Sequence, residues 1–287
     1  MLRLVSNGGL GNQLFEYAAV RAQAKRIGVG VEIDTRFYDQ DAPKDSKSFW
    51  LQTLPIKARI LRYQQSGPFA PNGFAIRMQR KVIMRVRRRY DEKKIFDKDP
   101  NFFKIGPNTV IRGFFQSLFY LLPRDEEIIA ELDPWHAASP PVLDHTRAVA
   151  AGNFVSVHVR RTDYLDYKGF EVTEFPKYVA AAMELARSRL GQPRFLVFSD
   201  DIAWCKEQEM FQRQCDFIET NRFGANPCFD LLLMSSCAHH IIANSTFSWW
   251  AAWFSYRQDK LCILPKHWIH GLTAEAIGLI APGWVVI

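Results

Sequence analysis

Strand and helix signals alternate through the second half of this 287-residue chain, and this alternation limits the folds open to it more than any other feature. Runs rich in β-branched and aromatic residues predict five strands, at 154–159, 195–198, 215–219, 240–243 and 261–264. Helix-compatible segments lie between them, at 174–190, 201–208, 228–237 and 246–256. Strands separated by single helices pack as a parallel sheet covered on both faces. The sequence therefore predicts an α/β fold whose C-terminal domain is a doubly wound parallel sheet.

The first half is less regular, but it opens with a strand–helix–strand unit. A strand at 2–6 leads through a glycine-rich turn at 7–13 into a helix at 14–27 and a strand at 31–34. Beyond it we expect a loop-rich stretch at 36–75, a helix at 77–90 and a strand at 109–115. Prolines and a glycine interrupt the pattern between 134 and 152, which predicts two domains, 1–145 and 146–287.

The formal net charge of +7 comes from one segment. Residues 77–94 hold nine Lys or Arg against Asp91 and Glu92, and this excess of seven equals that of the whole chain. Because the remainder is neutral, we expect no nucleic-acid partner. The amphipathic spacing makes 77–94 a candidate for peripheral contact with anionic lipid head groups, and the alternative is a solvated helix face.

Signals for export or membrane insertion are not found. The apolar run after Met1 is too short for a signal peptide, and no run of about 18 apolar residues occurs. The five cysteines are odd in number and form no C-x-x-C pair, which fits a reducing compartment and argues against a zinc site. We therefore expect a cytoplasmic protein, with any membrane contact on the inner face.

The segment FVSVHVRRTD at 154–163 ends a buried strand abruptly in charged residues. Open α/β sheets bind ligands at the carboxyl ends of their strands, where Arg160, Arg161 and Asp163 are expected to lie. Arginine holds phosphate through forked hydrogen bonds, so this segment indicates an anion site. The alternative is a strand end with solvated charges.

A glycine-rich loop, GGLGNQ at 8–13, follows the first strand and opens a helix. Such a loop lets backbone N–H groups approach a ligand, and a helix N-terminus favours negative charge. It lacks the full dinucleotide-binding pattern, but the acidic Asp34 lies about 20 residues further on. A nicotinamide-dependent oxidoreductase that uses this loop and Asp34 therefore stays open as the alternative function.

Polar residues also follow two other predicted strands. In FSDD at 198–201, Asp201 is placed to cap the next helix, which leaves Asp200 as the functional candidate. In NSTFSWWAAW at 244–253, hydroxyls and a helix N-terminus are available to phosphate, whereas the tryptophans are expected to pack in the core. Two D-x-D triplets, at 39–41 and 97–99, follow no convincing strand, so we expect no metal site.

Six segments, in this order, resemble glycosyl transferase family 11, the bacterial and animal α-1,2-fucosyltransferases. They are GGLGNQLFEYA at 8–18, RGFFQS at 112–117, VSVHVRRTDY at 155–164, FSDDIAWC at 198–205, DLLLMSSCAHHIIANSTFSWWAAW at 230–253 and LPKHW at 264–268. The resemblance implies two Rossmann-like domains facing a cleft, the glycosyltransferase B type, with the acceptor on the N-terminal side and GDP-fucose on the C-terminal side.

The activity that the resemblance implies is a galactoside α-1,2-L-fucosyltransferase. It would move L-fucose, with inversion and without a metal, from GDP-β-L-fucose to the 2-hydroxyl of a terminal β-galactoside in a surface glycan or oligosaccharide. A lipid-linked glycan ending in galactose is a further form of acceptor. No cofactor is implied, because GDP-fucose is a substrate.

The resemblance also assigns roles to individual residues. Arg160 would bind the diphosphate, and His158 and Asp230 would face the guanine. The residues that would line the phosphate and nucleoside pocket are Ser245, Thr246, Phe247 and Ser248. The loop residues that would help close the cleft or touch the acceptor are Gly9, Gly11, Asn12 and Gln13. The chain departs from the family at Thr162, where glycine is more usual, and in the basic segment 77–94.

Elementary chemistry agrees with these roles. Departure of GDP builds negative charge on the diphosphate, and without a metal that charge requires arginine and helix N-termini. The acceptor hydroxyl requires a proton acceptor. Asp163 is our first candidate for this base and Asp200 the second.

Overall fold

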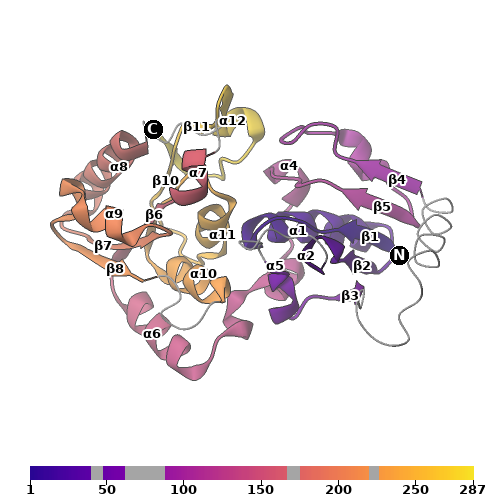
Figure 1. The fold of residues 1–287 in the computed structure, drawn as a ribbon, viewed down its shortest axis with the longest axis horizontal. Coiled ribbons are helices and arrows are strands. Elements are labelled where there is room, and N and C mark those ends of the chain that lie inside the picture. Colours follow the sequence, from indigo (N-terminus) through magenta and orange to yellow (C-terminus); the bar gives the residue numbers. More distant parts are fainter. Residues whose placement is uncertain (40–47, 62–87, 167–174, 220–225) are drawn as a thin grey trace. The chain divides into compact units, whose positions relative to one another are not determined.

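The computed structural model describes residues 1–39, 48–61, 88–166, 175–219 and 226–287, which form two compact units, Met1–Leu132 and Asp133–Ile287 (Figure 1). Each unit contains a parallel β-sheet with helices packed on it, which confirms the predicted α/β fold class. The first unit ends at Leu132, ahead of the predicted domain boundary at 145/146. The reason is that η3 (Pro134–Ala137) and α6 (Pro140–Ala151) pack against α10 (Pro227–Ser236) of the second unit. The predicted cleft between two domains stays a prediction.

Within the described residues, the first unit has a five-stranded sheet in the order β3-β2-β1-β5-β4, with every neighbouring pair parallel. Its strands are β1 (Leu2–Val5), β2 (Val31–Asp34), β3 (Ala58–Leu61), β4 (Arg88–Asp91) and β5 (Thr109–Arg112). Helix α1 (Leu10–Arg26) packs on β1 and β2, and Leu4, Ile33 and Leu14 from these three elements are fully buried. The shorter helices are α2 (Arg36–Asp39), η1 (Trp50–Thr53), η2 (Pro100–Lys104), α4 (Leu118–Leu121) and α5 (Glu126–Leu132).

Three predictions for this unit need correction. Helix α1 begins at Leu10 rather than at 14, so much of the predicted turn is its first turn. The predicted helix at 77–90 is wrong at Arg88–Tyr90, where pairing of β4 with β5 overrides the helical apolar spacing, and 77–87 lie outside the described residues. Strand β5 ends at Arg112 rather than 115, because Gly113 (φ 151°) and Phe115 (φ 51°) turn the chain.

In the second unit, the described strands form a six-stranded parallel sheet in the order β13-β10-β9-β6-β7-β8. The five predicted strands are confirmed as β6 (Phe154–Val159), β7 (Arg194–Ser199), β8 (Cys215–Ile218), β9 (His239–Ile241) and β10 (Cys262–Leu264). The sequence did not predict β13 (Val285–Val286), the antiparallel pair β11 (His267–Ile269) and β12 (Leu272–Thr273), or α12 (Ala274–Ile277).

Helices cover both faces of this sheet, as a doubly wound fold requires. Helices α8 (Phe175–Leu190) and α9 (Ile202–Glu207) pack on the face that carries Val155, Val157 and Val159. Side chains alternate along a strand, so His158 points to the opposite face. There its ring lies 5.8 Å from that of Phe247 in α11 (Thr246–Phe254). Helix α11 packs against α10, and its tryptophans Trp249, Trp250 and Trp253 are buried, which confirms their predicted packing role.

Candidate active site

The carboxyl edge of the second sheet is the place where this topology positions a ligand. Strand β6 lies between β7 and β9, and the chain continues from β6 to β7 and β8 on one side before it crosses to β9 on the other. Ligands of open α/β sheets bind at such a reversal, next to the carboxyl ends of the two strands. Here those ends lead into Arg160 and Arg161 after β6, and into Asn244 and Ser245 after β9.

Asp200 holds the turn that carries Arg160. Its Oδ1 accepts a hydrogen bond from the Arg161 backbone N–H at 2.9 Å. Its Oδ2 accepts from the Thr162 backbone N–H at 3.3 Å and from the Thr162 hydroxyl at 2.6 Å, and lies 3.3 Å from Arg160 Nε. These contacts fit a residue that positions the Arg160 guanidinium, and they leave the carboxylate poorly available as a base.

The two neighbouring arginines have different surroundings. Arg161 Nε donates to Asp201 Oδ2 at 3.0 Å, and its guanidinium lies 4.6 Å from the centre of the Trp204 ring. Asp201 also caps α9 by accepting from the Trp204 backbone N–H at 3.1 Å, as predicted. Arg161 is therefore tied to α9, whereas the Arg160 guanidinium lies 5.9 Å from the Tyr164 ring at the strand end.

Helix α11 begins beside this turn, close behind the end of β9. Ser245 is its N-cap residue, and its side chain makes no capping hydrogen bond. The hydroxyl of the buried Ser248 donates to the Ser245 carbonyl at 3.3 Å, so it serves the helix itself. Backbone N–H groups at such a helix start favour an anion, which agrees with the phosphate role predicted for Ser245 and Thr246.

His158 and Asp230 belong to the face of the sheet that α10 and α11 cover. His158 is buried against Phe247, and Asp230 lies in the first turn of α10. Burial raises the pKa of the Asp230 carboxyl to about 6. A carboxyl held in a partly desolvated place without a described cation partner is suited to accept hydrogen bonds from a polar ligand.

Asp163 lies in α7 (Thr162–Asp166), but its side chain is outside the part of the chain that the structure describes. Its role as the base stays a prediction.

In the first unit, the loop after β1 is held by Gln13. The buried Gln13 amide donates from Nε2 to the carbonyls of Gly8 (3.0 Å) and Ser48 (2.9 Å). Its Oε1 accepts from the backbone N–H groups of Trp50 (2.9 Å) and Leu51 (3.3 Å). Gln13 therefore joins two loops, and its predicted part in closing a cleft or touching an acceptor stays a prediction.

The rest of this loop is closely packed. Gly8 has φ 75°, and a Cβ there would lie 2.6 Å from Asn12 Nδ2, so only glycine fits. Asn12 Oδ1 accepts from Gln116 Nε2 at 3.1 Å, which links α1 to the chain after β5. The acceptor roles of Gly9, Gly11 and Asn12 stay predictions.

Replacement of Gln13 with alanine should lower the free energy of unfolding by about 2–4 kcal/mol, because buried backbone groups of two loops lose their partners. Chemical denaturation followed by circular dichroism measures this change. The matched control is Gln212→Ala, which removes one exposed hydrogen bond to the Lys206 carbonyl and should change stability by less than about 1 kcal/mol. Equal small effects of both variants would contradict the role given to Gln13.

Glu92 is a candidate that sequence reasoning missed, because the charge count treated it only as part of the basic segment. It follows β4, and its Oε2 accepts from the Phe114 backbone N–H at 2.7 Å. Its other oxygen is buried without a hydrogen-bond partner among the described residues. Burial, together with the nearby Asp97 carboxylate, raises the pKa of Glu92 to about 7, near the value that suits a general base.

Asp34 does not support a nicotinamide site. It is fully buried, and its Oδ1 accepts from the Arg36 backbone N–H (3.2 Å) and from Arg36 Nε (2.8 Å). The carboxylate is thus occupied by Arg36 and is not presented to a ribose.

Two further features of the described residues concern metals and membranes. There, no group of three or more His, Cys, Asp or Glu side chains is arranged to hold a metal ion. Asp99, from one D-x-D triplet, instead caps η2 and accepts from the Tyr90 hydroxyl at 2.9 Å. None of the helices in those same stretches combines the length and apolar composition of a membrane span.

Comparison with known proteins identifies relatives over the whole chain. The model of Glycosyl transferase family 11 matches residues 80–287. The Escherichia coli α-1,2-colitosyltransferase is 30% identical over 291 residues, covering 98% of this chain and 96% of that protein. The Escherichia coli O-antigen biosynthesis glycosyltransferase WbnK is 33% identical, covering 92% and 94%. The Mus musculus galactoside 2-alpha-L-fucosyltransferase Sec1 is 36% identical over 107 residues, covering 36% and 28%.

Proposed function

This chain belongs to glycosyl transferase family 11, and we propose that it transfers L-fucose from GDP-β-L-fucose to the 2-hydroxyl of a terminal β-galactoside, with inversion and without a metal. The observation that supports this most is Arg160, positioned by Asp200 at the reversal of the second sheet, where the start of α11 also lies. Together they offer a guanidinium and backbone N–H groups to a diphosphate.

In the proposed reaction, the acceptor oxygen attacks the anomeric carbon of fucose as the bond to the β-phosphate oxygen breaks. GDP leaves with the electron pair, and Arg160 and the start of α11 stabilise the negative charge that develops. The hydroxyl proton passes to a carboxylate. We keep Asp163 as the proposed base and assign Asp200 to positioning.

The proposal is tested by incubation of the chain with GDP-fucose and a panel of β-galactosides in EDTA. We expect a product with an α-1,2 linkage, identified by mass spectrometry and NMR. If no galactose-ended acceptor receives fucose, the proposed activity is wrong. If transfer requires added metal, the proposed mechanism is wrong.

Colitose is a second candidate for the transferred sugar, because a relative over nearly the whole chain is named an α-1,2-colitosyltransferase. Colitose is fucose without its 3-hydroxyl, so a site that fits fucose has room for either sugar. Parallel assays with GDP-fucose and GDP-colitose on one acceptor decide between them by the ratio of their kcat/KM values.

We also propose that the half-buried Asp230 accepts hydrogen bonds from the guanine N–H groups and must be ionised to do so. Its pKa is raised to about 6, so below that value the carboxyl is protonated in the free protein. The affinity for GDP-fucose should therefore fall about tenfold per pH unit below 6. Both phosphates of GDP-fucose are esterified, so the ligand itself does not titrate there.

Calorimetric titration between pH 5 and 8 measures this dependence. Asp230→Asn should bind more weakly at pH 8 and lose the pH dependence, whereas the exposed control Asp216→Asn should keep it. The same slope in Asp230→Asn as in the unaltered chain would show that another group titrates.

Peripheral membrane contact through the basic segment 77–94 is a separate proposal, suited to a lipid-linked acceptor. Within it, Arg88 and Arg89 are exposed, and residues 77–87 lie outside the described part. Co-sedimentation with vesicles of anionic and of neutral lipid tests it. Binding only to anionic vesicles, weakened by salt, is expected.

A further inference from the structure

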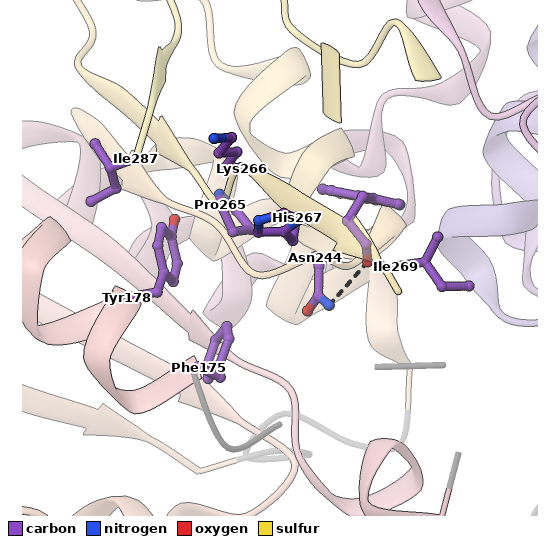
Figure 2. A pocket seen from close by; sticks show the side chains of 9 residues that line it. Phe175, Tyr178, Asn244, Pro265, Lys266, His267, Ile269 and Ile287 are labelled. Carbon is purple, nitrogen blue, oxygen red and sulfur yellow. Dashed lines mark hydrogen bonds between the residues drawn. The ribbon is translucent and has the colours of Figure 1, made fainter. Parts of the chain in front are cut away.

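A preformed pocket opens at the carboxyl ends of β9 and β10, next to the proposed phosphate site (Figure 2). It encloses about 210 Å³. Pockets for drug-sized ligands are larger, roughly 300–1,000 Å³, so this one suits a single sugar ring and not a whole nucleotide sugar. Its walls are mainly aromatic and aliphatic, and the lining includes Phe175, Tyr178, Asn244, Lys266, Trp268 and Ile269.

Hydrogen bonds hold the pocket in shape. The Tyr178 hydroxyl lies 2.8 Å from the Ile242 carbonyl and 3.0 Å from the Ile263 carbonyl, which fixes this ring against the strand ends. Asn244 Nδ2 donates to the Trp268 carbonyl at 3.1 Å, and Figure 2 shows this bond across the pocket. Asn244 Oδ1 accepts from no described donor, so it is available to a ligand hydroxyl.

Asn244 links the pocket to the proposed phosphate site along the chain. This residue directly precedes Ser245, the N-cap of α11, and its carbonyl accepts from the Tyr164 hydroxyl at 3.0 Å. The Tyr164 ring in turn faces the Arg160 guanidinium at 5.9 Å. The nucleoside candidates His158 and Asp230 belong to the α10 and α11 face, whereas Phe175 and Tyr178 come from α8, on the other face.

A nucleoside diphosphate sugar is a linear molecule with its phosphates in the middle. If the phosphates lie at the strand ends, between Arg160 and Ser245, a nucleoside directed toward α10 and α11 leaves the sugar to extend toward α8. That direction leads to the pocket beside Asn244.

We propose that this pocket holds the hexose ring of the donor, and that its apolar wall receives the C6 methyl group of a 6-deoxyhexose. This inference rests on the proposed function. Phe175, Ile269 and Trp268 offer no side-chain acceptor suited to a 6-hydroxyl, whereas Asn244 Oδ1 can accept from a ring hydroxyl. A 6-hydroxyl placed against this apolar wall, away from the Lys266 and His267 side chains that also line the pocket, would lack a hydrogen bond. This gives discrimination of about 10- to 100-fold.

Donor discrimination is the first test. GDP-L-galactose differs from GDP-L-fucose only by a 6-hydroxyl, and its kcat/KM should be about 10- to 100-fold lower on the same acceptor. Ile269→Ala enlarges the apolar wall and should reduce this ratio. Equal use of the two donors by the unaltered chain would overturn the assignment of the methyl group.

The second test fills the pocket with a larger side chain at Ile269, and the chain offers a matched control. Ile269 lines the pocket, while its cross-strand partner Leu272 is exposed and outside it. Ile269→Trp should weaken GDP-fucose binding about tenfold or more and leave GDP binding within about twofold, whereas Leu272→Trp should change neither. Unchanged GDP binding also shows that the variant is folded.

The outcomes separate this inference from the proposed function. If Ile269→Trp leaves GDP-fucose binding unchanged and raises only the KM of the acceptor, the pocket is an acceptor subsite and the inference is wrong. If both ligands weaken equally, the pocket holds the nucleotide part and the inference is again wrong. Failure of the proposed function would instead appear as GDP-fucose binding without transfer to any galactoside. In that case the effect of Ile269→Trp on GDP-fucose binding still tests whether the pocket holds the sugar.

Discussion

Replacement of Arg160 with alanine should lower kcat for sugar transfer by about 10²- to 10³-fold, the range typical of removing one preorganised donor to a developing anion. The guanidinium is placed at the strand end by Asp200 and beside the start of α11. Because the charge on GDP grows as the glycosidic bond breaks, the loss should appear mainly in kcat and less in the KM of the donor. Steady-state kinetics with a fixed acceptor measures it.

The neighbouring residue provides the control. Arg161→Ala removes the contacts with Asp201 and the Trp204 ring, so it should lower the free energy of unfolding by about 0.5–2 kcal/mol while kcat changes little. An Arg160→Ala variant with full kcat, or an Arg161→Ala variant with the larger loss, would reverse the assignment of the two arginines.

Replacement of Asp200 with alanine should lower kcat about 10- to 100-fold, because the turn that carries Arg160 loses the oxygens that hold it. A positioning residue and a base differ in the pH profile. If Asp200 only positions Arg160, the residual activity keeps the shape of the original profile. The acidic limb should disappear instead in the variant of the true base, which Asp163→Asn can identify.

A flat profile for Asp200→Ala would restore Asp200 as the base. Asp201→Ala is the matched control. It removes the cap of α9 and the partner of Arg161, and should therefore affect stability more than the profile.

The fold of the second unit could be predicted from sequence because its inner strands, β6, β7, β9 and β10, are buried on both faces. Such strands are short, almost continuous apolar runs, and the helices between them carry clear ends. Strand β13 has only two residues, so it leaves no periodic signal. In the first unit, β4 has the sequence RRYD, and it is a strand because β5 lies beside it. Tertiary pairing of this kind cannot be recognised from local preference.

The candidate site could be predicted where its residues follow strands directly, as Arg160 and Ser245 do. It could not be predicted where function depends on what a side chain contacts. Asp200 and Gln13 both carry groups that suit a ligand, yet in the structure their polar atoms serve the neighbouring backbone. The pocket beside Asn244 was also missed, since Phe175 and Ile269 are ordinary apolar residues until the chain brings them together.

The position of β1 in the first sheet has a consequence for the order of events during synthesis. One neighbour of β1 is β2, with Leu2 opposite Val31, but the other is β5, with Leu2 opposite Thr109. Strand β1 therefore leaves the ribosome more than a hundred residues before β5, and its second edge stays unpaired until β5 follows. Until then an apolar strand with an open edge is exposed to other chains. The nascent first unit should depend on chaperones until β5 emerges.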